Sequence, residues 1–391
     1  MYKNLILPAG LLAGTIIGAG IFALPFVFEK AGILTGLFYL IIFGGVFVLI
    51  HLMYAEIILK TEGNHRFPGY ARIYLGNFGL WATILTTVIG MVITLTIYLI
   101  LSVSFFNLIK PTNFNVFGFP GLLFFWILGS AAIFLEIRRL AFLELLITGG
   151  IIVIILIIAG YGLNFLDKIN TASIFNIQNI FLPYGAVLFA LAGRTAIPAV
   201  INYFQKIKQP LAGVKTPIIL GTLAPALTYL LFVFGILGLS GAVSEDAVSG
   251  LIGHVPDLIL TLIGIFGLIS LWSSYIVIGL DVKNTLRYDL KFPKILAGLA
   301  VIFSPLILFL LGFQNFLGMI GLVGGVFIAL EGIFIVLMWR KSRKTRLPAL
   351  EAAGLGGQVK PEPVIFKKLN PLIVYALIMV FIGGIIYEII H

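Results

Sequence analysis

The stretch Gly14-Thr-Ile-Ile-Gly18-Ala-Gly20-Ile-Phe-Ala-Leu-Pro25-Phe26 lies inside the first apolar run that is long enough to cross a membrane. Glycine and proline inside a helix cost roughly 1 and 3 kcal/mol relative to alanine, so this stretch predicts a helix that is interrupted near residues 18–20. In a lipid bilayer, the backbone groups freed by an interruption must find other partners. A spanning helix broken at its middle is typical of secondary transporters, in which the opened backbone holds a small charged solute.

The composition indicates a polytopic membrane protein. Of the 391 residues, 61% are hydrophobic and 10% are charged, whereas a soluble domain carries about 25% charged residues. The chain has no cysteine, which excludes disulfides, thiol catalysis and iron–sulfur ligation. Its four histidines lack the spacing of metal ligands. We therefore expect an all-α membrane protein without a bound cofactor.

Eleven apolar runs reach the length of about 20 residues that a helix needs to cross the bilayer. They cover about residues 5–28, 32–59, 79–109, 118–136, 140–163, 180–203, 214–241, 256–284, 293–311, 315–339 and 370–390. If the N-terminus is cytoplasmic, nearly all of the 25 lysines and arginines fall in cytoplasmic segments; the exceptions are Lys30, Lys110 and Lys168 in outer loops and Arg194 within a span. This asymmetry is the positive-inside signal. The net charge of +10 therefore reflects topology, and we expect no nucleic-acid partner.

The first ten predicted helices divide into two halves. The helical propensity of predicted helix one is lowest near residues 18–20, and that of predicted helix six near residues 190–193. Because helix six follows helix one by five spans, the two halves cross the membrane in opposite orientations. Paired interruptions in two inverted halves indicate the binding site of a transporter. The predicted units are a first repeat at 1–163, a second repeat at 164–339, a cytoplasmic linker at 340–369 and an eleventh helix at 370–391.

The backbone around the two breaks forms the candidate substrate site. The helical segment after the first break presents N–H groups and a positive dipole end to a carboxylate. Carbonyl groups freed at both breaks accept from an ammonium group; they belong to Ile16, Ile17, Leu188 and Phe189. The candidate substrate-binding residues are Ile17, Gly18, Ala19, Gly20, Phe22, Phe189, Ala190, Gly193 and Arg194, with Met91 and Thr94 of helix three shaping a side-chain pocket. The spacing of Gly14 and Gly18 also fits close helix packing.

Arg194 is the most costly residue of the predicted spans. An arginine at the middle of a membrane costs about 2.5–3.5 kcal/mol on insertion scales, so it needs a partner, for which Glu56 and Glu331 are candidates. Arg194 is interpreted either as half of a structural ion pair or as a substrate-carboxylate clamp or gating element.

Two coupling ions fit the sequence. Glu56, Glu144 and Glu331 are candidate proton carriers. A sodium site would combine carbonyl oxygens near Gly14 and Ile17 with the hydroxyls of Ser273 and Ser274, since oxygen ligands suit a hard cation.

The chain resembles the hydroxy and aromatic amino acid permease family, in the amino acid/auxin permease branch of the amino acid–polyamine–organocation superfamily. The motif at 14–26 carries the match, together with Phe-Ala-x-Ala-Gly-x-x-x-x-Pro198, the pair Ser273-Ser274 and a glycine-rich helix ten that ends in Leu-Met-Trp-Arg340. The resemblance implies the leucine-transporter fold, an inverted five-plus-five repeat plus one extra helix, and ion-coupled amino acid uptake.

The chain departs from this family pattern at Arg194, where many relatives have a histidine. Because arginine stays charged, a proton-coupling role does not transfer to this position. Proton-coupled relatives in the wider superfamily place a lysine in helix five, and the absence of lysine from 140–162 favours sodium.

These observations predict a secondary active transporter for neutral amino acids with hydrophobic or aromatic side chains, working by symport and alternating access in the cell (inner or plasma) membrane. Its expected partners are a small-molecule amino acid and the lipid bilayer, and the oligomeric state is left open. The alternatives are an amino acid sensor that kept the transporter fold, and an integral-membrane lipid-modifying enzyme. For the enzyme, Asp281 and Asp289 are the only acidic pair near the cytoplasmic face.

The basic residues predict a cytoplasmic N-terminus and an external C-terminus. A reporter fused after His391 should behave as external, and one fused near Gly356 as cytoplasmic, because an eleventh span separates them. Protease protection in oriented vesicles measures this. Finding both reporters on one side of the membrane would contradict the eleven-helix topology.

Overall fold

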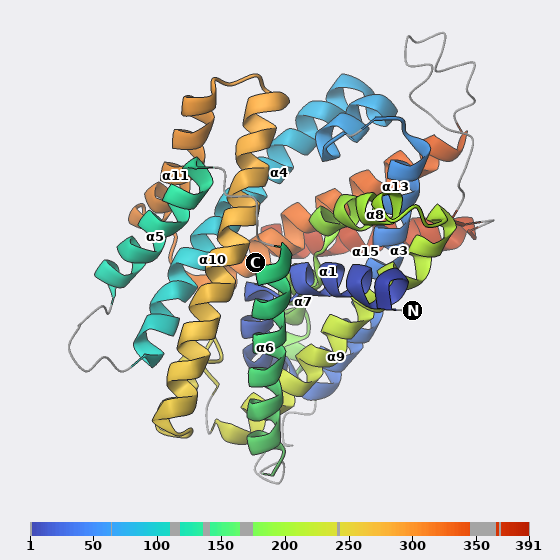
Figure 1. Cartoon of the computed structure of the whole chain (residues 1–391). Coiled ribbons are helices and arrows are strands. Elements are labelled where there is room, and N and C mark those ends of the chain that lie inside the picture. The colour runs from blue at the N-terminus through green and yellow to red at the C-terminus, as the bar shows by residue number, and fades with distance from the viewer. Residues whose placement is uncertain are drawn as a thin grey trace.

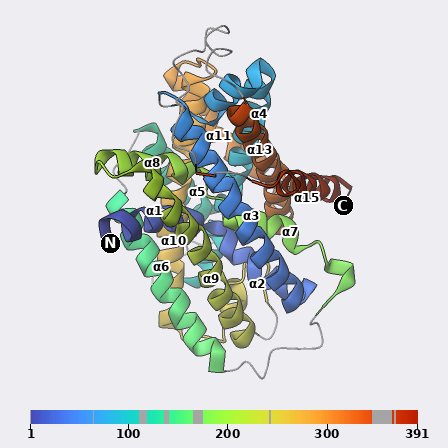
Figure 2. The ribbon, with the colours of Figure 1, turned by 90° about the vertical axis from the view of Figure 1, so that its right-hand side faces the viewer.

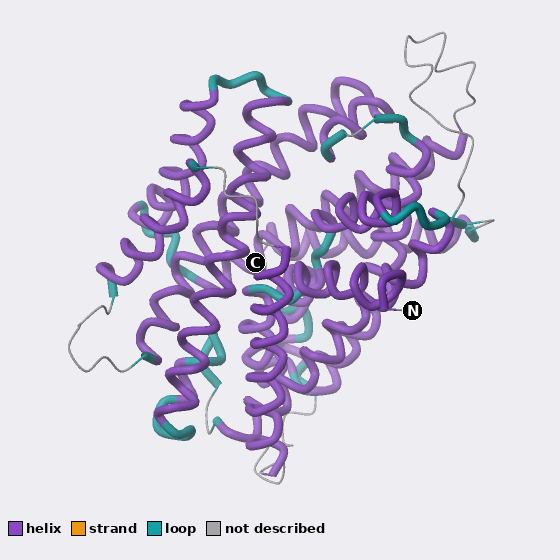
Figure 3. Tube along the Cα trace, viewed as in Figure 1, coloured by secondary structure: helices purple, strands orange, loops and turns teal. Residues whose placement is uncertain are grey.

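The computed structural model describes residues 2–63, 65–109, 118–135, 141–164, 175–240, 243–344, 365–366 and 369–390. All elements in this part of the chain are helices (Figures 1 and 3). The α-helices are α1 (Leu7–Ile16), α2 (Leu24–Ala31), α3 (Ile33–Lys60), α4 (Phe67–Leu108), α5 (Phe119–Phe134), α6 (Ala141–Gly162), α7 (Pro183–Leu191), α8 (Ile197–Lys206), α9 (Lys215–Leu239), α10 (Asp257–Tyr288), α11 (Lys294–Leu310), α12 (Phe316–Leu322), α13 (Ala329–Lys344) and α15 (Pro371–Ile390). Short 3₁₀ or π turns are η1 (Tyr2–Ile6), η2 (Ala19–Ala23), η5 (Ile177–Asn179), η6 (Arg194–Ala196), η7 (Leu211–Val214), η8 (Ser249–Leu251) and η9 (Val323–Ile328).

The apolar helices occupy the eleven runs expected from the sequence. Among the described residues, seven helices are long and apolar enough to cross a membrane, or eight with the bent N-terminal pair. Three shorter apolar helices, Phe119–Phe134, Thr148–Gly162 and Lys294–Leu310, lie at the fourth, fifth and ninth predicted runs. The protein is therefore a multi-pass membrane protein.

One helix begins earlier than expected. α4 starts at Phe67 and not near residue 79, and it leaves helical geometry at Gly76, where φ is 75°. A glycine adopts this conformation without a steric penalty because it has no Cβ. The residues before Gly76 therefore form a separate helical segment, which carries Phe67 into the interior of the protein, where it is buried.

Both weak points in the sequence are breaks in the structure. α1 ends at Ile16, residues 17–18 are extended, and η2 then leads into α2. The pieces before and after this break are bent by 53°. α7 ends at Leu191, and residues 192–193 leave the helix before η6 and α8. The helices that follow the breaks have Pro25 and Pro198 in their first turn, where a missing N–H loses no helical hydrogen bond.

The two breaks lie against each other. η2 contacts α7, and a Cβ on Gly20 would lie 2.5 Å from the Cα of Ala190. Only glycine at position 20 therefore allows the two backbones to approach so closely. In Figure 1, α6 and α10 run along the long direction of the bundle, and α1 is roughly perpendicular to them. Figure 2, turned by 90°, shows α3 and α9, which contact each other, running side by side.

Glycines also bring other helices together backbone to backbone. α6 packs on α9 where Gly162 meets Gly235 and Gly238. α1 packs on α9 where Gly221 meets the backbone of Ala9. Small residues commonly provide such close contacts between membrane helices. α9 is thus held against both α1 and α6 by surfaces that carry few side chains.

A buried carboxylate joins α3, α13 and the segment 365–366. The side chain of Glu56 is fully buried, and its Oε1 lies 3.3 Å from both Lys60 Nζ and Arg343 Nη1. The backbone N–H groups of Ile365 and Phe366 donate to its Oε2 at 3.1 and 3.0 Å. This set of donors compensates the carboxylate for its lost hydration.

Two parts of the predicted linker at 340–369 therefore have defined structure. α13 continues to Lys344, and Arg343 donates to the carbonyl oxygen of Phe366 at 2.7 Å. The ring of Phe366 packs edge-on against Trp339 at 5.7 Å. The segments 345–364 and 367–368 lie outside the described residues.

Replacing Glu56 should destabilise the protein. Glu56→Ala leaves the cations of α3 and α13 without their common anion, so we expect the free energy of unfolding to fall by about 3–5 kcal/mol. Denaturant titration in detergent measures this change. Glu62→Ala is the matched control, because Glu62 is exposed just beyond the end of the same helix. Equal stability of the two variants would show that the cluster does not stabilise the fold.

Candidate functional site

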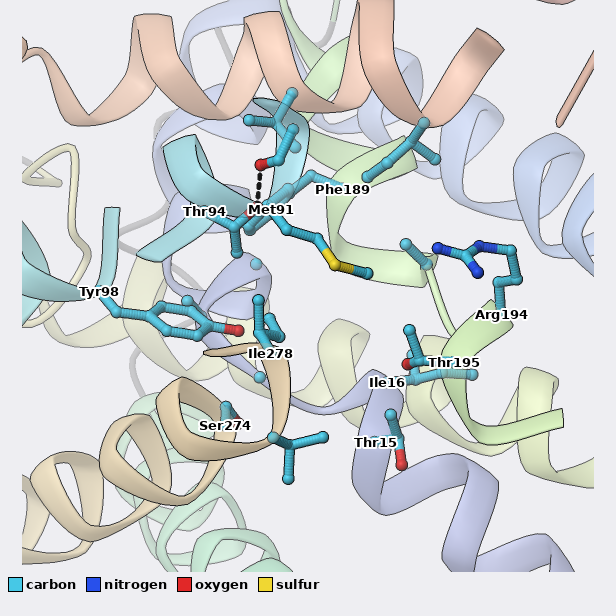
Figure 4. A pocket seen from close by; sticks show the side chains of 18 of the residues that line it. Thr15, Ile16, Met91, Thr94, Tyr98, Phe189, Arg194, Thr195, Ser274 and Ile278 are labelled. Carbon is cyan, nitrogen blue, oxygen red and sulfur yellow. Dashed lines mark hydrogen bonds between the residues drawn. The ribbon is translucent and has the colours of Figure 1, made fainter. Parts of the chain in front are cut away.

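A cavity of about 140 Å³ lies beside the two breaks (Figure 4). Its hydroxyl groups come from Thr15, Thr86, Thr87, Thr94, Tyr98, Thr148, Thr195, Ser270, Ser273 and Ser274, and its large apolar side chains from Ile16, Ile17, Met91, Phe189, Val277, Ile278, Val323, Phe327 and Ile328. In Figure 4, Tyr98 and Ser274 lie on one side of the cavity and Arg194 and Thr195 on the other, with Met91 extending between them. The cavity thus combines neutral polar groups with an apolar surface.

Most of the residues expected from the sequence line this cavity. They are Gly14, Ile17, Gly18, Ala19, Gly20, Met91, Thr94, Phe189, Arg194, Ser273 and Ser274. Four others do not, and Leu188 is one of them, a buried residue within α7. Phe22 packs against Phe105 and Phe232, with ring centroids 5.0 and 5.7 Å away. Ala190 lies behind Gly20, and Gly193 faces Ile16 and His51.

A tyrosine that the sequence analysis did not select joins the two breaks. The hydroxyl of Tyr229 in α9 lies 2.8 Å from the carbonyl oxygen of Ile16 and 2.7 Å from that of Ala190. The carbonyl of Ile16, expected to accept from a substrate ammonium group, is therefore already hydrogen-bonded. The carbonyl of Phe189 also has a partner, the N–H of Ala192 at 3.4 Å.

Arg194 is paired with Glu331, one of its two expected partners. Its Nε and Nη2 donate to the two carboxylate oxygens at 2.8 and 2.9 Å, a bidentate geometry. The guanidinium carbon also lies 4.2 Å from the centre of the Phe67 ring, and Thr87 donates to Glu331 Oε1 at 3.2 Å. Both the cation and the carboxylate line the cavity, so the ion pair forms part of its wall.

The other candidate acids have different surroundings. Glu56 belongs to the cluster with Lys60 and Arg343, and the side chain of Glu144 lies outside the described residues. Asp289, half of the acidic pair considered for an enzyme, forms an ion pair with Arg66 at 2.7 Å.

The candidate sodium ligands line one cavity. Ser273 and Ser274 line the same cavity as Gly14 and Ile17, and the Oγ of Ser273 is buried with no hydrogen-bond partner among the described residues. A Cβ on Gly14 would lie 2.8 Å from Oγ1 of Thr148, which the sequence analysis missed. Thr148 adds a third hydroxyl, from α6, to this group of oxygen atoms.

Comparisons with known proteins confirm the family resemblance and the fold. The tryptophan/tyrosine permease family matches residues 1–366, which leaves α15 outside the match. No curated protein matches the sequence. The crystal structure of MhsT in complex with L-phenylalanine gives a TM-score of 0.65 at 14% sequence identity, covering 98% of each chain. Mhp1, a nucleobase-cation-symport-1 family transporter solved in a closed conformation with bromovinylhydantoin bound, gives 0.60 at 15% identity, covering 98% of this chain and 90% of Mhp1. Both are leucine-transporter-fold proteins, so this chain has that fold.

The close contact between the breaks predicts unequal effects of two glycine substitutions. Gly20→Ala should lower the free energy of unfolding by about 1–3 kcal/mol, because its Cβ would lie 2.5 Å from the Cα of Ala190. Gly18→Ala is the control, since its Cβ would have ordinary contact, 3.7 Å from the hydroxyl of Tyr98. Thermal unfolding in detergent compares the two. Equal loss in both variants would contradict the role given to Gly20.

Proposed function

The chain belongs to the tryptophan/tyrosine permease family, and we propose that it carries an aromatic or large hydrophobic neutral amino acid across the cell membrane, driven by a cation gradient. The cavity between the two broken helices is the observation that carries this proposal. It lies where opened backbone meets an apolar wall. MhsT, which has the same fold, was solved with L-phenylalanine.

The two sides of the cavity suit the two ends of such a substrate. Because the chain is extended at 17–18, the N–H groups that begin η2 lack the acceptors of a continuous helix and suit a carboxylate. Met91, Phe189 and Phe327 offer an apolar surface to the side chain. Burying a side chain of this size contributes about 1.5–3 kcal/mol. The backbone N–H groups thus bind the carboxylate of the amino acid, and the apolar surface binds its side chain.

The pairing with Glu331 weighs against Arg194 as a carboxylate clamp. Glu331 accepts from the Nε and Nη2 side of the guanidinium, so a substrate carboxylate would compete with the glutamate for the same cation. We therefore assign Arg194 to the conformational cycle, in which η6 and α13 separate when the ion pair opens.

Sodium is the coupling ion that the oxygen atoms at the first break favour. The hydroxyls of Thr148, Ser273 and Ser274 are neutral oxygen ligands and line the same cavity as Gly14, with that of Thr148 directly against Gly14. Oxygen ligands of this kind suit a hard monovalent cation. Of the carboxylates considered as proton carriers, Glu56 and Glu331 both face cations. These pairings weigh against either glutamate as the carrier of a coupling proton.

Uptake into proteoliposomes tests the proposed transport. Wild-type protein should exchange labelled L-tryptophan, L-tyrosine or L-phenylalanine across the bilayer and accumulate it under an inward sodium gradient. Ser273→Ala should raise the sodium concentration that gives half-maximal uptake, since it removes one oxygen ligand. Ser249→Ala, in the short turn η8 outside the cavity, is a matched control. No exchange of any amino acid by folded protein would contradict transport, and accumulation without sodium would contradict the ion.

A further inference from the structure

His51, which the transport site described above does not use, is fully buried in α3 behind the second break. Its Nδ1 lies 2.9 Å from the hydroxyl oxygen of Thr222 in α9, and the ring stacks at a tilt on Phe47 at 5.5 Å. A Cβ on Gly193 would lie 3.2 Å from its Cε1, so the far edge of the ring faces the second break.

The hydrogen bonds of Thr222 assign the proton of the neutral imidazole to one ring nitrogen. Thr222 donates its single hydroxyl hydrogen to the carbonyl oxygen of Ile218 at 2.8 Å, so its oxygen accepts from His51. The imidazole therefore has its N–H at Nδ1, and Nε2 is left with a bare lone pair. Nε2 is buried and has no hydrogen-bond partner among the described residues. A buried acceptor without a partner is uncommon and requires a physical explanation.

A second, smaller cavity connects this histidine with the ion pair of the transport site. It has a volume of about 20 Å³, and His51, Gly193, Arg194, Glu331 and Phe381 are among its lining residues. Arg194 and Glu331 line the larger cavity as well, so the ion pair stands between the two cavities.

The charged groups that face His51 come from two elements. In the described part of the lining, these groups are Arg194 of η6 and Glu331 of α13. α9 contributes the neutral hydroxyl of Thr222, and α15 contributes the apolar ring of Phe381.

We propose that Nε2 of His51 is a proton-binding site of the transport cycle, which controls whether Arg194 stays bound to Glu331. A proton taken from water binds the Nε2 lone pair and gives an imidazolium with an N–H on each nitrogen. The new positive charge repels Arg194 and attracts Glu331. The imidazolium of His51 therefore competes with Arg194 for the carboxylate of Glu331. Loss of the proton restores the pair. This inference rests on the proposed transport function and adds a chemical control to it.

The proposal gives transport a dependence on pH with a defined sign. Protonation loosens the pair that joins η6 to α13, so uptake should rise as the pH falls. The imidazolium fraction of a histidine changes by up to about tenfold per pH unit on the basic side of its titration. The effect should disappear when Nε2 is removed while the bond to Thr222 is kept.

His51→Asn provides that change, because the Asn amide can still donate to Thr222 and has no Nε2. At a fixed sodium gradient, wild-type uptake of labelled L-tryptophan should increase at least about threefold from pH 8 to pH 5. His51→Asn should show no increase while still exchanging labelled for unlabelled substrate at pH 8. His254→Asn, which alters an exposed histidine of the outer loop, should keep the wild-type profile.

Each result has one meaning. If wild-type protein exchanges substrate but its uptake does not depend on pH, or if His51→Asn keeps the wild-type pH dependence, the inference is wrong and transport stands. If His51→Asn does not fold, His51→Gln is measured in the same way, with exchange at pH 8 as the test of folding. Wild-type protein that exchanges no amino acid at any pH would overturn the proposed function itself.

Discussion

The hydroxyl of Tyr229 lies within hydrogen-bond distance of one carbonyl from each broken helix. In a membrane interior, a carbonyl without a donor costs several kcal/mol, and water is not at hand to replace the lost helical N–H. α9 supplies that donor from outside both breaks. A hydroxyl has a single hydrogen, so the two carbonyls share it. The open backbone beside the cavity depends on this side chain, since without it α1 and α7 would each end in an unsatisfied carbonyl.

The ion pair between Arg194 and Glu331 stabilises two charged side chains that are largely removed from water. Neither side chain faces bulk water freely, with exposed fractions of 10% and 15%. The bidentate contact, the ring of Phe67 and the hydroxyl of Thr87 together replace much of the lost hydration. Because the pair connects η6, at the start of the second half-helix, with α13, it holds these two parts of the cavity wall together.

The sequence predicts those features that arise from local chemistry. Apolar run length places the spans, and the glycines and prolines near 18–20 and 190–193 place the breaks, because each acts on its own backbone. Phe22 was expected at the substrate site because it directly follows the first break. The 3₁₀ geometry of η2 instead places its ring against Phe105 and Phe232, a contact that local sequence does not predict.

Tyr229, Thr148 and Phe67 could not be found from sequence, since nothing near them in the chain distinguishes them from other apolar or hydroxyl residues. Their roles come from neighbours more than a hundred residues away in most cases, such as Ile16 for Tyr229. The sequence left two candidate partners for Arg194, namely Glu56 and Glu331. The packing of α3 and α13 decides between them, since it pairs Arg194 with Glu331 and Glu56 with Arg343.

The glycine contacts of α9 reduce the change in side-chain conformational entropy that accompanies a rearrangement of this bundle. Where Gly235 and Gly238 meet α6, and where Gly221 meets α1, the glycine side of the contact has no side chain that occupies a rotamer. Fixing or releasing a long side chain changes the free energy by up to about 2 kcal/mol through its rotamer freedom. Helices that slide along backbone surfaces avoid much of this change. At these glycine contacts, the loss or gain of rotamer freedom therefore contributes little to the free energy of any movement of α1 or α6 over α9.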